Sequence, residues 1–585
     1  MVLSRRFFPY FVTQCLGALN DNVYKNVLLL FVTYSQVESL PIGVNLFVNL
    51  AAGLFILPFF LFSAHAGIIA DNMDKALLIK RLKLLEVIIM LCAAVAILTQ
   101  SYLLMLLLLF LTGVQSAYFG PVKYSLLPQV LKDKELVKGN AWVEMGTFIS
   151  ILTGTITAGF IVASDSPKFF AAMSVCFLAL SGYLSSLLIP AIPLNREPNK
   201  LRFAPFSGTI NSIRKVQRTP SIWIAVLAIS WFWFLGATYL TQFPNFAKIH
   251  LHSGATVVSL LLALFSIGIA VGSFTCERFS FKQVELGLLP FGLLGLALFG
   301  VDLYWAIPGG AWEQEQVYTA LSFLYESKHY RLMFDLFMVG VSGGVFIVPL
   351  YAFIQARTKE GECAQAIAAN NILNALFMVV SALVSMIILG ILNWTIIELF
   401  LLLAITNFAV GLFLYIRQPE LGMRFIAYLH SRIFHPVTVI DRDLIPRTEG
   451  ALLIGSSSTP KELFLLQHLS IRQIRIMVKG ALRQDWWSGL LRWSGKTVEF
   501  TFSQNMGVDV HHCEEREEML SQIELALSDN ELVYLSKEDY LLLSDALSVR
   551  LAAFPKCNIS INSSEASKPE AGGQRADTSL IVTLV

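Results

Sequence analysis

Residues 44–99, VNLFVNLAAGLFILPFFLFSAHAGIIADNMDKALLIKRLKLLEVIIMLCAAVAILT, set the pattern that most of the chain repeats. The stretch holds two apolar runs, 44–65 and 77–99, joined by a short turn that carries Asp71 and Lys75. Each run can cross roughly 30 Å of hydrocarbon at about 1.5 Å per residue. The stretch therefore predicts two transmembrane helices connected by a charged turn on one side of a membrane.

Similar apolar runs recur up to residue 416, with a polar break after the sixth. Hydrophobic residues make up 55% of the 585 residues and charged residues only 14%, a balance that excludes a water-soluble fold of this length. The expected spans are 11–34, 44–65, 77–99, 102–122, 143–163, 169–190, 221–243, 256–275, 284–303, 332–355, 366–390 and 394–416. They predict an all-α membrane fold of twelve helices, in six-helix halves at about 1–192 and 221–416, with a basic cytoplasmic linker at 193–220.

Lysine and arginine gather in the loops on one side of these spans, near Arg5, Lys75 and Lys132 and in the 193–220 linker. Cytoplasmic loops are enriched in these two residues and external loops are not. The asymmetry predicts that both termini are cytoplasmic and that the 302–331 loop is external. The first run follows Arg5 as a signal peptide would, but its length and polar residues indicate a span that the mature protein retains.

The two halves repeat one pattern at the end of their fourth span and the start of their fifth. The matching residues are Gly113 and Gly340, Pro121 and Pro349, Tyr124 and Tyr351, and Asn140 and Asn370. Two six-helix halves related by an axis along the membrane normal leave a weak parallel repeat of this kind. The pattern resembles the major facilitator fold.

After residue 416 the chain changes to short apolar runs between charged residues, such as 450–455 and 473–478. These runs have the length of strands and are too short to cross a bilayer. They predict a smaller cytoplasmic α/β domain at 417–562. The polar composition beyond it predicts a polar tail at 563–585, disordered over 563–579.

Charge and cysteine content exclude several other classes of protein. A formal net charge of +2 gives no sign of nucleic-acid binding, and the seven cysteines have no paired spacing. We therefore expect no nucleic-acid partner, no metal, no cofactor and no disulfide framework.

Asp21, Asn22 and Lys25 stand in the middle of the first expected span. An Asp or Lys at mid-helix costs about 2.5–3.5 kcal/mol on insertion scales, so such residues face a cavity or a partner. Asp21 and Lys25 are four residues apart, a spacing that allows them to pair. Two interpretations stay open: a pair that satisfies itself inside the bundle, or substrate binding in a central cavity with Asp21 as the leading candidate.

A second set of polar residues lies near the cytoplasmic ends of the spans. Lys123 either extends to the lipid headgroups or contacts an anionic phosphate. The other side chains either join helices by hydrogen bonds or line the same cavity. These further candidates for substrate binding are Lys123, Tyr124, Asn140, Glu144, Asn370 and Asn371.

The turn after the second span, with Gly67, Asp71 and Lys75, resembles the loop signature of the major facilitator superfamily. In that signature the Gly permits close helix approach and the Asp caps or pairs across the interface between the halves. Asn72 and Asp74 depart from the usual pattern. The resemblance implies a gating element, and the alternative is an ordinary cytoplasmic turn.

Five stretches together resemble the bacterial lysophospholipid transporter family, over roughly residues 5–416 of a transporter domain at 1–416. These are QCLGALNDN at 14–22, GIIAD at 67–71, AYFGPVKY at 117–124, LVKGN at 136–140 and GGVFIVPLYAFIQ at 343–355. The resemblance implies the flipping of lysophospholipids, such as lysophosphatidylethanolamine, across the bacterial inner membrane for reacylation. It also implies membrane lipids and a separate acyltransferase or acyl-carrier-protein ligase as partners.

Because that family occurs beside or fused to a glycerolipid acyltransferase, the C-terminal domain can be compared with the acyltransferase motif. Ser457 stands where the motif has its His, and Glu462 stands where it has its Asp. Without an imidazole the domain lacks a general base, a contribution typically worth about 10²–10⁴-fold in rate. We therefore interpret it as a truncated and inactive acyltransferase-like domain.

Two alternatives to lysophospholipid transport stay open at this point. The first is a proton-coupled exporter of drugs or small metabolites, because one fold serves many substrates. The second is an active glycerolipid acyltransferase with a membrane anchor, which would require catalysis without the usual His.

Overall fold

The computed structural model divides the chain into two units, residues 1–284 with 288–411, and residues 285–287 with 412–585. The structure describes the chain apart from residues 2, 35–43, 193–204, 281–285, 308–317, 360, 418, 434–436, 441–443, 447–448, 457–458, 467–473, 480–485, 494–496, 501–509, 530, 542–553, 564–577 and 585.

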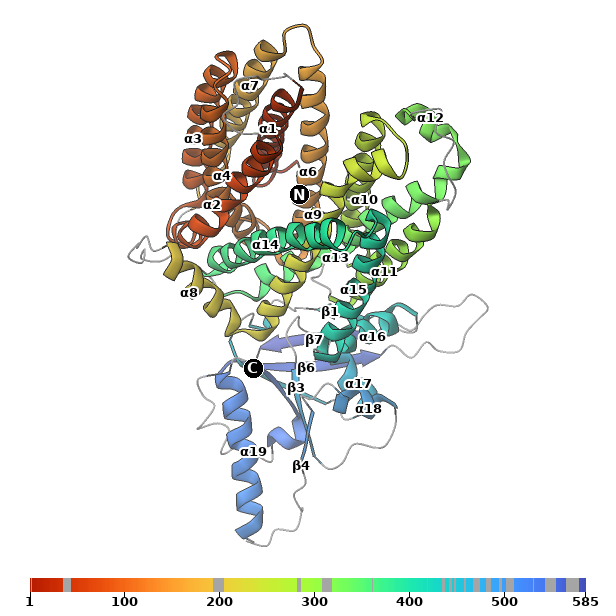
Figure 1. The fold of residues 1–585 in the computed structure, drawn as a ribbon. Coiled ribbons are helices and arrows are strands. Elements are labelled where there is room, and N and C mark those ends of the chain that lie inside the picture. The colour runs from red at the N-terminus through yellow and green to blue at the C-terminus, as the bar shows by residue number, and fades with distance from the viewer. Residues whose placement is uncertain are drawn as a thin grey trace, which may run out of the picture. The chain divides into compact units, whose positions relative to one another are not determined.

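The first unit is a bundle of long helices (Figure 1). Twelve of them occur among the described residues, and the last one continues past residue 411. They are α1 (Phe8–Tyr34), α2 (Val44–Asn72), α3 (Lys75–Leu98), α4 (Tyr102–Ser125), α6 (Asp133–Val162), α7 (Pro167–Leu187), α9 (Pro220–Ile249), α10 (Ala255–Phe279), α11 (Leu289–Ala306), α13 (Tyr330–Arg357), α14 (Cys363–Met386) and α15 (Ile396–Arg417). Each overlaps one expected span, so the twelve-helix prediction is confirmed.

Ten helices among the described residues are long and apolar enough to cross a membrane, which makes the chain a multi-pass membrane protein. The remaining two of the twelve are α1, with its mid-helix Asp21 and Lys25, and α3, with five charged residues. Shorter helices occur in the connections: α5 (Leu127–Val130), α8 (Pro205–Gln217) in the linker and α12 (Ala320–Tyr325) in the 302–331 loop.

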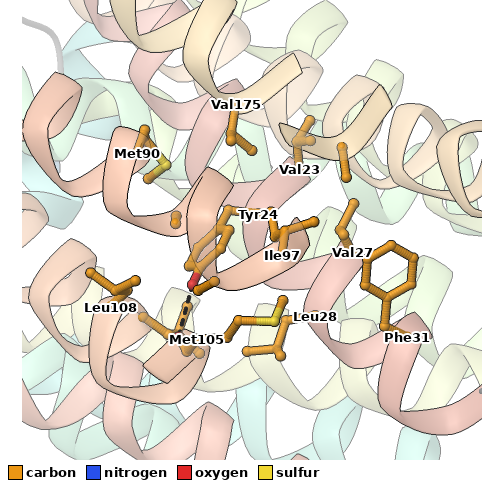
Figure 2. Packing of buried hydrophobic residues seen from close by; sticks show 14 of the residues in the cluster. Val23, Tyr24, Val27, Leu28, Phe31, Met90, Ile97, Met105, Leu108 and Val175 are labelled. Carbon is orange, nitrogen blue, oxygen red and sulfur yellow. Dashed lines mark hydrogen bonds between the residues drawn. The ribbon is translucent and has the colours of Figure 1, made fainter. Parts of the chain in front are cut away.

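The N-terminal half buries an apolar core to which α1, α2, α3, α4, α6 and α7 all contribute. Figure 2 shows Tyr24 of α1 among aliphatic and thioether side chains, including Ile97 of α3 and Val175 of α7. The Tyr24 hydroxyl donates to the Met105 carbonyl of α4 at 2.8 Å, so the phenol is satisfied inside the bundle. Large apolar side chains such as Leu103 are exposed on the bundle, as lipid-facing helices require.

In each half, a glycine allows two helices to pack closely, and the two pairs of helices correspond to each other. A methyl group at Gly113 of α4 would lie 2.7 Å from the Phe55 carbonyl oxygen of α2. A methyl group at Gly340 of α13 would lie 2.4 Å from the Phe265 carbonyl oxygen of α10. Small residues permit this approach between helices in lipid. The repeat in the sequence therefore corresponds to the same packing contact in both halves.

The described residues of the second unit form a seven-stranded sheet of order β1-β7-β6-β2-β5-β3-β4. All neighbouring strands are parallel except β6 and β7, which are antiparallel. The strands are β1 (Val437–Ile440), β2 (Ala451–Gly455), β3 (Ile474–Lys479), β4 (Thr497–Phe500), β5 (Leu532–Ser536), β6 (Lys556–Ser563) and β7 (Thr578–Leu584).

Helices cover both faces of this sheet. Two separate apolar cores lie against it, one with α16 (Pro419–Ile433), α17 (Pro460–Leu465) and α18 (Trp486–Trp493), the other with α19 (Val510–Ser528). The central strands are buried on both faces, which explains their short, continuous apolar runs. The predicted α/β class of this domain is confirmed.

The last residues of the predicted polar tail form a strand, while residues 564–577, most of the stretch expected to be disordered, lie outside the described residues. Residues Thr578–Leu584 form β7, which pairs with β6 and with β1. The segment TSLIVTL is rich in β-branched residues, which favour strands.

Candidate functional site

The nine predicted substrate-binding residues separate into two groups. Asp21, Asn22 and Lys25 lie in the middle of α1, and with Ser116 of α4 we name them the α1 site. The other six lie at the ends of α4, α6 and α14 that face the turn between α2 and α3. We name the contacts between the two halves at those ends the turn-side gate.

Within the α1 site the two charged residues contact different partners. Asp21 Oδ2 accepts a hydrogen bond from the Ser116 hydroxyl at 2.6 Å. Lys25 Nζ donates to Asn22 Oδ1 at 3.2 Å and lies 5.9 Å from the centroid of the Phe55 ring. The ion pairs within 4.0 Å among the described residues do not include Asp21 with Lys25, so the pairing that the spacing allows is not formed.

The unpaired charges of the α1 site are partly exposed. Asp21, Asn22 and Lys25 all have intermediate exposure, although they stand at the middle of a long helix. Asp21 Oδ1 is buried and accepts no hydrogen bond from the described residues. A carboxylate and an ammonium group thus stand one helical turn apart without forming an ion pair with each other.

Sequence reasoning missed a buried charged cluster next to the α1 site. Lys83 and Glu86 of α3 form an ion pair at 2.6 Å, and each residue is 1% exposed. Glu86 also accepts from Asn20 of α1 and Gln115 of α4. The signal was present in the sequence, because two charges three residues apart inside an expected span carry the same insertion cost as Asp21.

The predicted gating turn contacts the start of α14 in the other half. Asp71 accepts from the backbone N–H of Ala364 at 3.0 Å and of Gln365 at 3.1 Å, and also from the Gln365 side chain. A methyl group at Gly67 would lie 2.7 Å from the Ala368 Cβ. The carboxylate thus caps a helix N-terminus, where free N–H groups and the helix dipole favour an anion. Lys75 is buried beside this cap.

Two tyrosines that the sequence repeat relates stack on each other across the gate. The rings of Tyr124 and Tyr351 have centroids 4.2 Å apart and are parallel within 1°. Tyr124 donates its hydroxyl to Glu144 Oε1 at 2.5 Å, and Asn370 Nδ2 lies 3.5 Å from the Tyr351 hydroxyl. The stack therefore joins a buried carboxylate in one half to an amide in the other.

The remaining candidates occupy the same region. Asn140 and Gln355 exchange two hydrogen bonds of 2.7 and 2.9 Å between the halves. Lys123 Nζ donates to Thr147 of α6 at 2.7 Å, so its ammonium group binds inside the bundle. A methyl group at Gly120 would lie 2.6 Å from the Asn371 amide, which places Asn371 in the contact between α4 and α14.

We expect the amide pair to contribute measurably to the closed gate. Asn140→Ala and Gln355→Ala should each lower the unfolding free energy, and the double variant should lose less than the sum of the two losses. The coupling should be about 0.6–1.7 kcal/mol, the range found for polar contacts between membrane helices. A double-mutant cycle of unfolding in detergent measures it. Additive losses would show that the pair is not formed in solution.

The acyltransferase-like motif is only partly described. Ser457 lies outside the described residues. Glu462 is in the first turn of α17, and its N–H donates to the Thr459 hydroxyl at 3.3 Å, an ordinary helix cap.

The twelve-helix fold is typical of the major facilitator class. Residues 11–325 match the sequence family described as the Major Facilitator Superfamily, and the chain belongs to that family. The human organic anion transporter MFSD10 (TETRAN) shares the fold with a TM-score of 0.56, at 12% identity, over 69% of this chain and 98% of that chain.

Two bacterial relatives are similar in sequence. The chain is 28% identical to "Lysophospholipid transporter LplT" of Enterobacter sp. (strain 638), over 45% of this chain and 61% of that protein. It is 26% identical to the protein of the same name from Cronobacter sakazakii (strain ATCC BAA-894), over 63% of this chain and 85% of that protein. With the Enterobacter relative the chain thus aligns over less than two thirds of that protein's length.

Proposed function

We propose that this chain transports lysophospholipids, such as lysophosphatidylethanolamine, across the bacterial inner membrane. The observation that carries the proposal is the separation of Asp21 from Lys25 on one partly exposed face of α1. A lysophosphatidylethanolamine headgroup carries an anionic phosphate and a cationic amine, and the α1 site offers one charge of opposite sign to each. The names of the bacterial relatives support the same substrate class.

In this proposal the headgroup enters the α1 site with its phosphate toward Lys25 and its amine toward Asp21. The single acyl chain lies along apolar helix faces, where no polar group needs a partner. Rocking of the two halves then opens and closes the turn-side gate, as alternating access requires. The other predicted residues, Lys123, Tyr124, Asn140, Glu144, Asn370 and Asn371, act at the gate in this scheme.

The positive loops support an orientation with both termini in the cytoplasm, so that the turn between α2 and α3 faces the cytoplasm. The capped α14 and the stacked tyrosines then describe a conformation that is closed on the cytoplasmic side.

The direct test uses purified protein in liposomes. Labelled lysophosphatidylethanolamine should move across the membrane only in vesicles that contain the protein. Mass spectrometry of lipids that co-purify with the protein should detect monoacyl phospholipids above their share in the membrane. Absence of both signals, with the protein folded, would overturn the proposed function.

We also propose that the C-terminal domain does not transfer acyl groups. The full chain, incubated with a lysophospholipid and an acyl donor, should form no diacyl product above the level of a protein-free control. An active glycerolipid acyltransferase in the same assay serves as the positive control. Formation of diacyl product above background would show that the domain is an active acyltransferase. A separate acyltransferase or acyl-carrier-protein ligase would then be unnecessary as a partner.

A further inference from the structure

The buried Lys83–Glu86 pair on α3 contacts residues that are next in sequence to two members of the α1 site. Glu86 Oε1 accepts from Asn20 Nδ2 at 3.2 Å, and Glu86 Oε2 accepts from Gln115 Nε2 at 3.2 Å. The residues that follow these two in sequence are Asp21 and Ser116, which bond to each other at 2.6 Å. The Glu86 carboxylate thus binds α1 and α4 at the residues that directly precede the Asp21–Ser116 hydrogen bond.

Lys83 supplies the charge that lets Glu86 remain in this position. The ion pair is 2.6 Å long, and the ammonium group also lies 5.1 Å from the centroid of the Phe119 ring. An unpaired buried carboxylate would be strongly unfavourable, whereas a paired one with its remaining acceptor sites filled is tolerated. Glu86 receives donors from α1, α3 and α4, so its acceptor sites are used.

The helix α1 packs closely over the cluster. A methyl group at Gly17 would lie 2.2 Å from Lys83 Nζ, so a side chain there would displace the ammonium group from its present position. Asn20 is completely buried and Glu86 is 1% exposed. In this conformation the cluster cannot touch a substrate, and any effect on transport must pass through other residues.

We propose that Glu86, neutralised by Lys83, is a positioning residue that fixes α1 against α4 and thereby sets the contact between Asp21 and Ser116. We call the Lys83–Glu86 pair with its hydrogen bonds to Asn20 and Gln115 the anchor. Without the anchor, α1 is free to rotate or shift, and the Asp21 carboxylate loses its fixed direction. This role deepens the proposed function, because it assigns the residues that orient the headgroup site. The effect of the anchor on the packing of α1 can be measured without any lipid.

The first experiment measures how the residue at position 21 is presented. Asp21→Cys is introduced alone and together with Lys83→Met/Glu86→Gln, a pair of changes that removes both charges and keeps a similar volume. A water-soluble methanethiosulfonate reagent labels the purified proteins, and peptide mass spectrometry quantifies labelling at position 21. We expect the labelling rate to change at least about fivefold when the anchor is removed. An unchanged rate would overturn the anchoring role.

The matched control is a buried polar contact in the other half. Asn407 of α15 accepts from the Trp231 indole at 3.1 Å and donates to the Leu293 carbonyl at 2.9 Å. Asn407→Ala removes bonds of similar kind without touching α1. It should lower the melting temperature while leaving the labelling rate at position 21 unchanged. A change in that rate would show that general loosening, and not loss of the anchor, is being measured.

The second experiment tests whether the anchor acts through Asp21. Uptake of lysophosphatidylethanolamine is compared in a cycle of Lys83→Met/Glu86→Gln with Asp21→Asn. The anchor variant should lower kcat/KM about tenfold in the wild-type background and less than twofold in the Asp21→Asn background, because interacting residues are non-additive. If the anchor variant lowers kcat/KM by the same factor in both backgrounds, the cluster does not act through Asp21 and has only a structural role.

A further variant covers the case in which the double substitution does not fold. Asn20→Ala leaves Lys83, Glu86 and Gln115 together and releases only α1. It should change the labelling rate at position 21 in the same direction. If wild-type protein moves no lysophospholipid, the proposed function fails, while the labelling rates still decide whether the anchor exists.

Discussion

Asp21→Asn should lower lysophosphatidylethanolamine uptake about a hundredfold, and Asp21→Ala should abolish it. Asn keeps the size of the side chain and can still accept from the Ser116 hydroxyl, so the loss reports the missing charge. Removing one partner of a desolvated charge pair costs about 2–5 kcal/mol, which corresponds to such a factor. The measurement is initial uptake into liposomes at a substrate concentration well below saturation.

Asp165→Asn is the matched control for this prediction, because it removes an exposed carboxylate from the same half outside the helices. Its uptake should equal that of the wild type. Melting temperatures of the three variants show whether each protein is folded. Uptake by folded Asp21→Asn at the wild-type rate would remove the Asp21 charge from the mechanism.

Gly67→Val should reduce uptake by at least about tenfold by preventing the turn-side gate from closing. Its Cβ would lie 2.7 Å from the Ala368 Cβ and 2.9 Å from the Ala364 carbonyl oxygen, a separation that real structures do not show. Because neither contact atom is the end of a flexible side chain, α2 and α14 must move apart. Overpacking of this kind typically costs about 1–3 kcal/mol, and the closed state bears that cost.

The same helix provides the control for this variant. A methyl group at Gly53 of α2 meets no atom within 4 Å, so Gly53→Val should leave uptake close to the wild-type rate. Cross-linking between cysteines introduced on α2 and α14 at the gate measures closure directly. Equal cross-linking in Gly67→Val and Gly53→Val proteins would show that the gate tolerates the larger side chain.

The twelve helices could be predicted because a lipid environment demands long, uninterrupted apolar runs, and few other structures satisfy that demand. The repeat of Gly113 and Gly340 also had structural meaning, since both glycines serve the same helix contact. The strand β7 was not predicted, because its apolar residues directly follow a polar stretch that dominates the composition of 563–585. Composition averaged over a segment conceals a short strand at its end.

The candidate site could be predicted only in part. Spacing along a helix indicates which residues share a face, but it does not say what neighbouring helices offer them. Asp21 therefore bonds to Ser116 of α4, and not to Lys25 of its own helix. The α1 site lies at the middle of its helix, whereas the residues of the turn-side gate lie near the helix ends. Lys83 and Glu86 were overlooked since they follow the basic start of α3.

The cap that Asp71 places on α14 has a consequence for the entry of water. While the gate is closed, the carboxylate satisfies the N–H groups of Ala364 and Gln365, which have no partner within their own helix. Hydrocarbon chains offer no hydrogen bonds, so lipid cannot replace the carboxylate when α2 and α14 separate. In the proposed transport cycle, hydration of the α14 terminus must therefore accompany the opening of the turn-side gate.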